Sequence, residues 1–326
     1  MKNIIKRLIL LFSPVLDILA APFVLAGALF FKVIRRYGVA RLSLCRRIFW
    51  VVGVMPVTNH YYDPFFRKEE LKRSLREDRH LPGINLNPQG QLDLLKCFKY
   101  NEELVRLPRQ PGPALEFYYD NVAFLSGDAE FLYNVVRHFK PQRLVEVGSG
   151  FSSLMALKAM EANREEDRSY RGEMICIEPF EHRWLEELNV SVRRQLVQMM
   201  DIDFFLSLKE NDILFIDSSH ITKPQNDVLF LYLQVLPVLN PGVLVHLHDI
   251  FTPRDYLDQW VLKDVRFWNE QYLLEAFLSL NGQFEVIGAL NFLMHQYPDE
   301  LLSVCPVLKE QMPYREPGSF WIRKVN

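Results

Sequence analysis

From about Gly112 to the C-terminus, short β-type runs alternate with helical runs. This alternation is typical of a parallel sheet covered by helices on both faces, because parallel neighbours need a crossover connection. The runs predict strands at residues 143–147, 174–178, 192–198, 213–217, 243–248, 284–289 and 320–323, and helices near residues 131–139, 151–162, 182–188, 225–239 and 269–280. We therefore expect an α/β fold with a doubly wound, mostly parallel, seven-stranded sheet.

The ends of the first two strands indicate a nucleoside-type ligand, because such sheets bind ligands beyond the carboxyl ends of their strands. The first strand runs through Glu146 into Gly148-Ser149-Gly150, where glycine permits a tight turn and close backbone approach to a ligand. Alone, this motif could be an ordinary strand-to-helix turn. The second strand ends at Glu178, whose carboxylate can accept both hydroxyls of a ribose. The full dinucleotide fingerprint and the P-loop motif are missing from the sequence, which favours an adenosyl ligand without phosphates.

Polar side chains also follow the fourth and fifth strands, at Asp217, His220 and Asp249. Two carboxylates at neighbouring strand ends can share a hard divalent ion such as magnesium. The His220 imidazole, three residues beyond Asp217, is suited to take a proton from a substrate hydroxyl, so we predict it to be the general base. The alternative is that Asp217 and Asp249 cap the turn and the helix that follow them. We expect His246 to be a core residue, and the role of His248 stays open.

Composition excludes several classes of function. The formal net charge is −2, and no basic face or binding motif suggests a nucleic-acid partner. The four cysteines form no C-x-x-C pair, so the sequence predicts neither a zinc site nor a disulfide framework. Reduced thiols in a cytosolic compartment are the expected state.

The apolar residues crowd into the first 57 positions. The run from Leu8 to Phe31 has Asp17 as its one charged residue and is long enough to cross a bilayer as a helix. Asp17, Pro14 and Pro22 oppose a simple span, so a monotopic hairpin, an interfacial helix and a buried hairpin of a soluble protein remain open. Basic residues concentrate after the run, which places the body of the chain in the cytoplasm.

These patterns predict three parts. Residues 1–59 form a hydrophobic, membrane-associating helical appendage, in which the second apolar run at 48–57 is too short to span. Residues 60–120 form a linker and cap, with a solvated helix over the charged run 67–79. Residues 121–326 form the catalytic domain.

The motifs together resemble a known family. The segments VEVGSGFSS, CIEPFE, FIDSSH, LVHLHDIF and SFWIRK, within residues 128–324, resemble class I S-adenosylmethionine-dependent methyltransferases with a Rossmann-like sheet. The branch is that of the metal-dependent sugar O-methyltransferases of macrolide biosynthesis. The resemblance implies that Glu146, Gly148 and Gly150, with Ser149 between them, line the methionine end of S-adenosylmethionine. It further implies that Glu178 holds the ribose, Asp217 and Asp249 ligate magnesium, and His220 is the base. Ser218 and Ser219 stand where relatives often have a glycine and an acid, so no third metal ligand is assigned.

The expected function is S-adenosylmethionine-dependent O-methylation of a hydroxyl on a small-molecule, saccharide or glycolipid acceptor, with magnesium-assisted deprotonation. One alternative is a metal-independent methyltransferase of a lipid or quinone. Another is a non-catalytic, membrane-tethered scaffold with the same fold. The sequence leaves the acceptor and the oligomeric state open.

Overall fold

The computed structural model describes residues 2–326, with the backbone alone for residues 2–12 and 313. Contacts within the chain divide it into two compact units, Met1–Lys72 and Arg73–Asn326. Residues 73–120, expected to be part of a linker and cap, therefore cluster with the sheet. The boundaries at residues 60 and 121 stay predictions.

The first unit contains helix α1 (Lys2–Tyr37), a 3-10 turn η1 (Val39–Arg41), helix α2 (Ser43–Val52) and a 3-10 turn η2 (Lys68–Glu70). The Phe31 ring of α1 meets the Phe49 ring of α2 edge to face at 5.6 Å. Residues Ser13–Tyr37 are long and apolar enough to cross a membrane, and no part of their most apolar window is buried.

The helix expected over residues 67–79 is wrong, because the described backbone there forms only the short turn η2. Arg79, at the end of the run, instead donates to Glu275 at 2.8 Å and to the carbonyl of Arg254 at 2.9 Å. A short run of charges cannot sustain a helix without tertiary packing, and these distant partners hold the chain in a different conformation.

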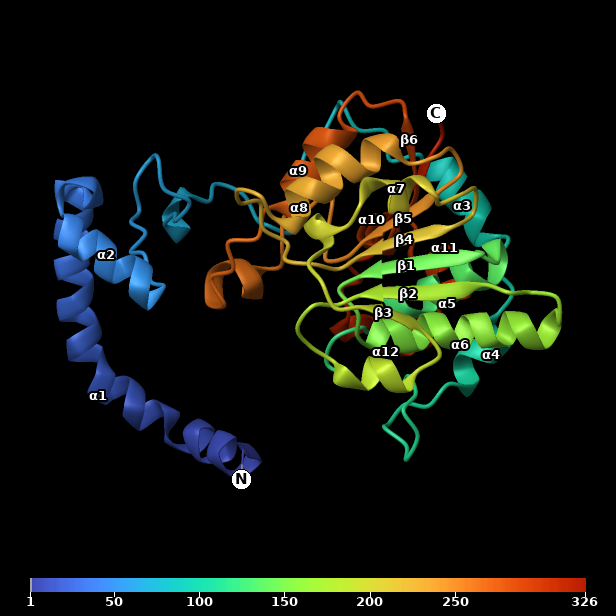
Figure 1. Cartoon of the computed structure of the whole chain (residues 1–326), viewed down its shortest axis with the longest axis horizontal. Coiled ribbons are helices and arrows are strands. Elements are labelled where there is room, and N and C mark those ends of the chain that lie inside the picture. Colours follow the sequence, from blue (N-terminus) through green and yellow to red (C-terminus); the bar gives the residue numbers. More distant parts are fainter. Residues whose placement is uncertain (1) are drawn as a thin grey trace. The chain divides into compact units, whose positions relative to one another are not determined.

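The second unit is built on a seven-stranded sheet in the order β3-β2-β1-β4-β5-β7-β6 (Figure 1). The strands are β1 (Arg143–Val147), β2 (Glu173–Ile177), β3 (Ser191–Arg193), β4 (Ile213–Ile216), β5 (Leu244–Leu247), β6 (Phe284–Ala289) and β7 (Phe320–Lys324). Strands β1 to β5 pair in parallel, whereas β7 is antiparallel to both β5 and β6. The predicted seven-stranded, mostly parallel, doubly wound sheet is thus confirmed.

Helices and turns cover the sheet between its strands. The α-helices are α3 (Pro88–Leu95), α4 (Asn101–Arg106), α5 (Asp128–Phe139), α6 (Phe151–Glu166), α7 (Ile202–Leu206), α8 (Asp227–Phe230), α9 (Glu270–Leu278), α10 (Leu290–Gln296), α11 (Pro298–Val304) and α12 (Pro306–Gln311). The shorter turns are η3 (Arg183–Glu187), η4 (Val197–Met199), η5 (Leu231–Val235), η6 (Leu236–Val238), η7 (Gln259–Lys263) and η8 (Met312–Tyr314), of which η5 and η7 are π-helical.

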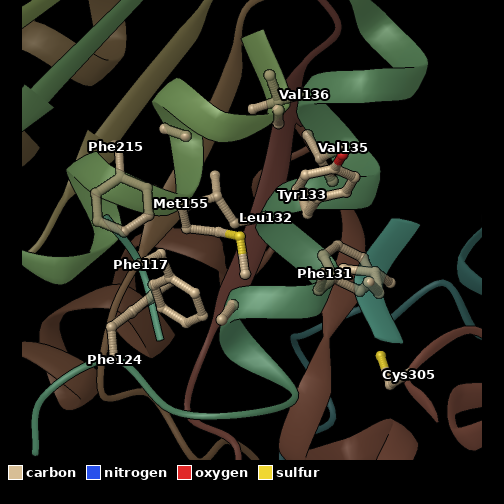
Figure 2. Close-up of a cluster of buried hydrophobic side chains, with 14 of the residues drawn as sticks. Phe117, Phe124, Phe131, Leu132, Tyr133, Val135, Val136, Met155, Phe215 and Cys305 are labelled. Atoms are coloured by element: carbon tan, nitrogen blue, oxygen red, sulfur yellow. The ribbon is translucent and has the colours of Figure 1, made fainter. Parts of the chain in front are cut away.

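Two hydrophobic clusters form the core, one on each face of the sheet. Helices α5 and α6 pack in the first cluster, while η5 and α9 pack in the second. Figure 2 shows the first cluster, where Leu132 of α5 lies beside Met155 of α6, and Phe215 of β4 lies near Phe124. Phe117 and Phe124 are 2% exposed, so the segment before α5 belongs to the core. This packing fixes the sheet whose strand ends carry the candidate site.

Candidate active site

The loop after β1 approaches the end of β4 closely. Gly148 has φ +80°, and a Cβ built on it would lie 1.7 Å from the carbonyl oxygen of Asp217. Only glycine fits there without displacing backbone. Glu146, which precedes the loop, is 1% exposed and accepts hydrogen bonds from two hydroxyls in the first turn of α6, those of Ser152, at 2.6 Å, and Ser153. Glu146 therefore shapes the loop through α6.

A cavity of about 500 Å³ opens beyond the ends of β1, β2 and β4, a size typical of small-molecule sites. Gly148, Glu178 and Asp217 lie in its wall, with Phe180 and Val197 as apolar neighbours. Glu178 Oε1 accepts from the backbone N–H groups of Phe180 and Glu181, each at 2.9 Å. These bonds fix the carboxylate at the cavity wall.

The remaining predicted residues of the loop lie beside this cavity. Ser149 is 5% exposed, its backbone N–H lies 3.4 Å from Glu178 Oε2, and its hydroxyl has no hydrogen-bond partner within the described residues. Gly150 faces His182, and a Cβ on it would lie 3.6 Å from His182 Nε2. A buried hydroxyl without a partner is uncommon, so a ligand at this loop would satisfy it.

The three residues predicted at the ends of β4 and β5 come together. His220 Nε2 lies 3.2 Å from Asp217 Oδ1 and 3.6 Å from Asp249 Oδ2. One ligand atom from each of Asp217, His220 and Asp249 falls within 4.8 Å of the others. His220 and Asp249 have left-handed backbones, with φ of 58° and 59°. Such strain in residues other than glycine persists where the surrounding structure enforces it, as in functional sites.

The electrostatics of this cluster follow from burial and from the pairing of histidine with acid. Burial raises the pKa of Asp249. Burial would also raise the pKa of Asp217, but the charges of His248 and His220 outweigh it and lower the pKa overall. Burial opposes charge on His220, yet hydrogen bonds to Asp217 and Glu270 raise its pKa well above the usual value. The cluster is thus two carboxylates that attract one positive charge.

The two histidines on and after β5 have different surroundings. His246 is fully buried, stacks on Phe215 at 3.8 Å, and pairs with the Ser319 hydroxyl at 2.9 Å. This environment matches the expected core residue. His248 is 6% exposed, and its Nε2 lies 3.5 Å from Asp249 Oδ1. His248 therefore adjoins the carboxylate cluster.

Sequence reasoning missed Glu270, the first residue of α9. Its Oε2 lies 2.9 Å from His220 Nδ1, and the residue is 1% exposed. This bond orients the imidazole so that Nε2 faces Asp217 and Asp249. The only sequence signal was an acid in the first turn of a helix, where it is common for reasons of the helix dipole.

The buried Glu146 predicts a pH-dependent stability difference. Burial raises its pKa to about 7, whereas an exposed glutamate titrates near 4.5. Its stabilising contribution is therefore complete below pH 4.5 and is lost as the pH rises through 7. Between pH 4.5 and 8, we expect the free energy of unfolding of the wild type to fall by up to about 3 kcal/mol relative to that of Glu146→Gln, measured by urea unfolding. Glu165 is exposed on α6, so Glu165→Gln is the control and should follow the wild type across the pH range. If the difference in free energy of unfolding between wild type and Glu146→Gln stays the same from pH 4.5 to 8, the prediction is contradicted.

The comparisons with known proteins agree with this fold. A methyltransferase-domain family matches residues 145–250, which include the strand ends described above. An uncharacterized protein of Archaeoglobus fulgidus is 32% identical over 175 residues, covering 50% of this chain and 77% of its own.

Similar solved structures include the O-methyltransferase from Bacillus cereus in complex with SAH, at 13% identity and a TM-score of 0.35, covering 74% of this chain and 92% of that one. Another is the MycE methyltransferase of the mycinamycin pathway in complex with Mg and SAH, at 16% identity and a TM-score of 0.29, covering 60% and 48%. The seven-stranded sheet and the matched domain define a methyltransferase. The matched domain and the sheet support a class I S-adenosylmethionine-dependent methyltransferase.

Proposed function

We propose that this enzyme transfers the methyl group of S-adenosylmethionine to a hydroxyl of a saccharide or glycolipid at a membrane, with magnesium assisting deprotonation. The observation that carries the proposal is the convergence of Asp217, His220 and Asp249 at the strand ends, where Asp217 also lines the cavity. A base and two carboxylates beside a cofactor cavity suit the activation of an acceptor hydroxyl.

The cofactor is proposed to occupy the cavity beyond β1, β2 and β4. Glu178 would accept the ribose hydroxyls, since among the described residues its Oε2 is engaged only by the Ser149 N–H, at 3.4 Å. The Gly148-Ser149-Gly150 loop would hold the methionine end. Phe180 is 79% exposed at the cavity wall and offers an apolar face to the adenine.

The residues fit a divalent cation. Asp217 and Asp249 supply carboxylate oxygens from two neighbouring strand ends, the donors that magnesium prefers. When bound there, magnesium would hold the acceptor oxygen and favour loss of its proton. Asp217 and Asp249 are proposed as ligands.

The chemistry is proposed as an in-line displacement. A cation held by Asp217 and Asp249 would offset part of the negative charge that raises the pKa of His220, which would leave Nε2 free to accept the proton of the acceptor hydroxyl. The oxygen then bonds to the methyl carbon, and the carbon–sulfur bond breaks to leave S-adenosylhomocysteine. Glu270 holds His220 Nδ1 at 2.9 Å and keeps the imidazole aimed at the acceptor. The enzyme thus acts mainly by positioning and by charge.

The first unit is proposed to hold the enzyme at the membrane with the sheet unit in the cytoplasm. Large apolar side chains stay exposed along both of its long helices, including Phe23 at 80% and Trp50 at 75%. Exposed apolar patches of this kind mark interaction surfaces, and the basic residues after the apolar run suit anionic lipid headgroups. A membrane-held site supports a glycolipid acceptor.

Titration of the full-length protein in detergent with S-adenosylhomocysteine tests the cofactor site. We expect saturable binding by calorimetry, weakened at least about 10-fold in Glu178→Gln because a ribose hydroxyl loses its charged acceptor. Glu187→Ala, an exposed glutamate nine positions further on, is the control. Equal affinity in wild type and Glu178→Gln would contradict the assignment of Glu178.

Methyl transfer to saccharide and lipid fractions, with and without a chelator, separates the proposal from its alternatives. Transfer of labelled methyl groups to the saccharide fraction, lost when the chelator is added, supports the proposal. Chelator-resistant label in lipid or quinone favours the metal-independent enzyme. Cofactor binding without transfer to any fraction favours the scaffold.

A further inference from the structure

The segment between β5 and α9, drawn in orange in Figure 1, carries an arginine that lies against two tryptophan rings. The Arg266 guanidinium carbon lies 4.6 Å from the Trp260 ring centroid and 4.5 Å from that of Trp268. The two indole rings meet edge to face at 5.1 Å. Both tryptophans are only partly buried, so their rings and the cation together form an open surface.

This surface adjoins the proposed base. The Trp268 ring centroid lies 4.3 Å from that of His220, which places an indole against the imidazole. An acceptor whose hydroxyl reaches His220 Nε2 would therefore extend over Trp268. The three residues lie outside the wall of the cofactor cavity, so they are available to the acceptor.

The backbone is strained to build this arrangement. Val265 has φ +51°, a left-handed conformation that is a clear outlier for a β-branched residue. The turn it makes returns the chain so that the Arg266 N–H donates to the Trp260 carbonyl at 2.9 Å. Strain of this kind persists where the fold enforces it and clusters at ligand sites, so it supports a ligand-binding role for this turn.

The chemistry of the surface selects a class of ligand. Indole rings present flat, apolar faces on which the C–H face of a sugar ring can pack. The Arg266 guanidinium carbon lies over both indole rings, and the ion-pair partner of its N–H groups among the described residues is Asp264, at a long 3.4 Å. Guanidinium N–H groups match carboxylate and phosphate oxygens, often in bidentate geometry.

We propose that Trp260, Arg266 and Trp268 form the acceptor-recognition surface, and that the acceptor is an anionic saccharide with a carboxylate or phosphate near the methylated hydroxyl. The inference rests on the proposed function, since it places the acceptor at His220. Arg266 gives the surface its preference for anionic over neutral sugars, and the two tryptophans bind the sugar ring.

The test measures binding to the full-length protein in detergent, saturated with S-adenosylhomocysteine. The probes are methyl β-glucuronide for a carboxylate, glucose 6-phosphate for a phosphate and methyl β-glucoside as the neutral sugar, with dissociation constants measured by ligand-observed NMR. We expect at least one anionic probe to bind at least about 10-fold more tightly than the neutral sugar. The better of the two anionic probes identifies the acidic group.

In Arg266→Gln, the anionic preference should disappear while affinity for S-adenosylhomocysteine stays the same. Trp268→Leu should weaken all three probes alike. Lys263→Gln, an exposed cation in the same segment, is the matched control and should keep the preference. Equal binding of neutral and anionic probes to wild type, no binding of either anionic probe, or a preference that survives in Arg266→Gln would each overturn the inference. Failure of the proposed function appears separately, as loss of cofactor binding or of methyl transfer.

Discussion

Replacing Gly148 with alanine is expected to lower the free energy of unfolding of the sheet unit by at least about 3 kcal/mol and to abolish S-adenosylhomocysteine binding. The new Cβ would lie 1.7 Å from the Asp217 carbonyl oxygen and 2.8 Å from its carbon, so the ends of β1 and β4 must part. The φ of +80° adds strain for any L side chain. Urea unfolding and calorimetry measure the two effects.

Gly150, two residues further on, is the matched control. Its φ of −172° suits any residue, and its Cβ would meet only the His182 side chain, at 3.6 Å. We expect Gly150→Ala to stay within about 1 kcal/mol of wild type in stability. The prediction is contradicted if Gly148→Ala has the same free energy of unfolding as the wild type and still binds S-adenosylhomocysteine. That result would show that the ends of β1 and β4 separate at little cost.

The strand ends were predictable because strand period and motif order identify them together. β1 and β6 have the predicted bounds, and β4 and β5 end within one residue of their predicted ends. The third strand was predicted to reach Gln198 but ends at Arg193, because the chain then turns inward and buries Val197 at the cavity. Hydrophobic character alone does not distinguish such a turn from a strand.

Other features depend on contacts that sequence periodicity does not carry. The helix predicted over 225–239 is interrupted by η5 and η6, since Pro237 removes a backbone donor from the last turn. Helices α10 to α12 were not predicted, although Pro298 and Pro306 stand at first helical positions and offered a signal. Glu270 reaches His220 from 50 positions away, and only the fold shows that pairing.

Replacing His220 with glutamine is expected to lower kcat by about 10²–10⁴-fold and to leave S-adenosylhomocysteine binding unchanged, because a proton acceptor is lost from a site beside the cofactor cavity. Methyl transfer to the acceptor at saturating cofactor measures the first effect, and calorimetry the second. Glu270→Gln keeps an oxygen for His220 Nδ1–H but removes the charge, so we expect a smaller loss, of about 10-fold.

His295→Gln is the matched control, because His295 also pairs with a glutamate, Glu316, at 2.9 Å but lies apart from the carboxylate cluster. Its kcat should equal that of wild type. An unchanged kcat in His220→Gln would contradict the assignment of His220 as the base.

The same variant separates the two roles that the geometry allows for His220. Its Nε2 lies between Asp217 and Asp249, so it could be a third metal ligand as well as a base. Manganese, which accepts both oxygen and imidazole donors, can be followed by electron paramagnetic resonance. If His220 is the base, manganese affinity survives in His220→Gln and is lost in Asp217→Asn. If His220 is a ligand, both variants lose the ion, and another group must take the proton. His248, whose Nε2 lies 3.5 Å from Asp249 Oδ1, would then be a candidate, and His248→Gln would lower kcat.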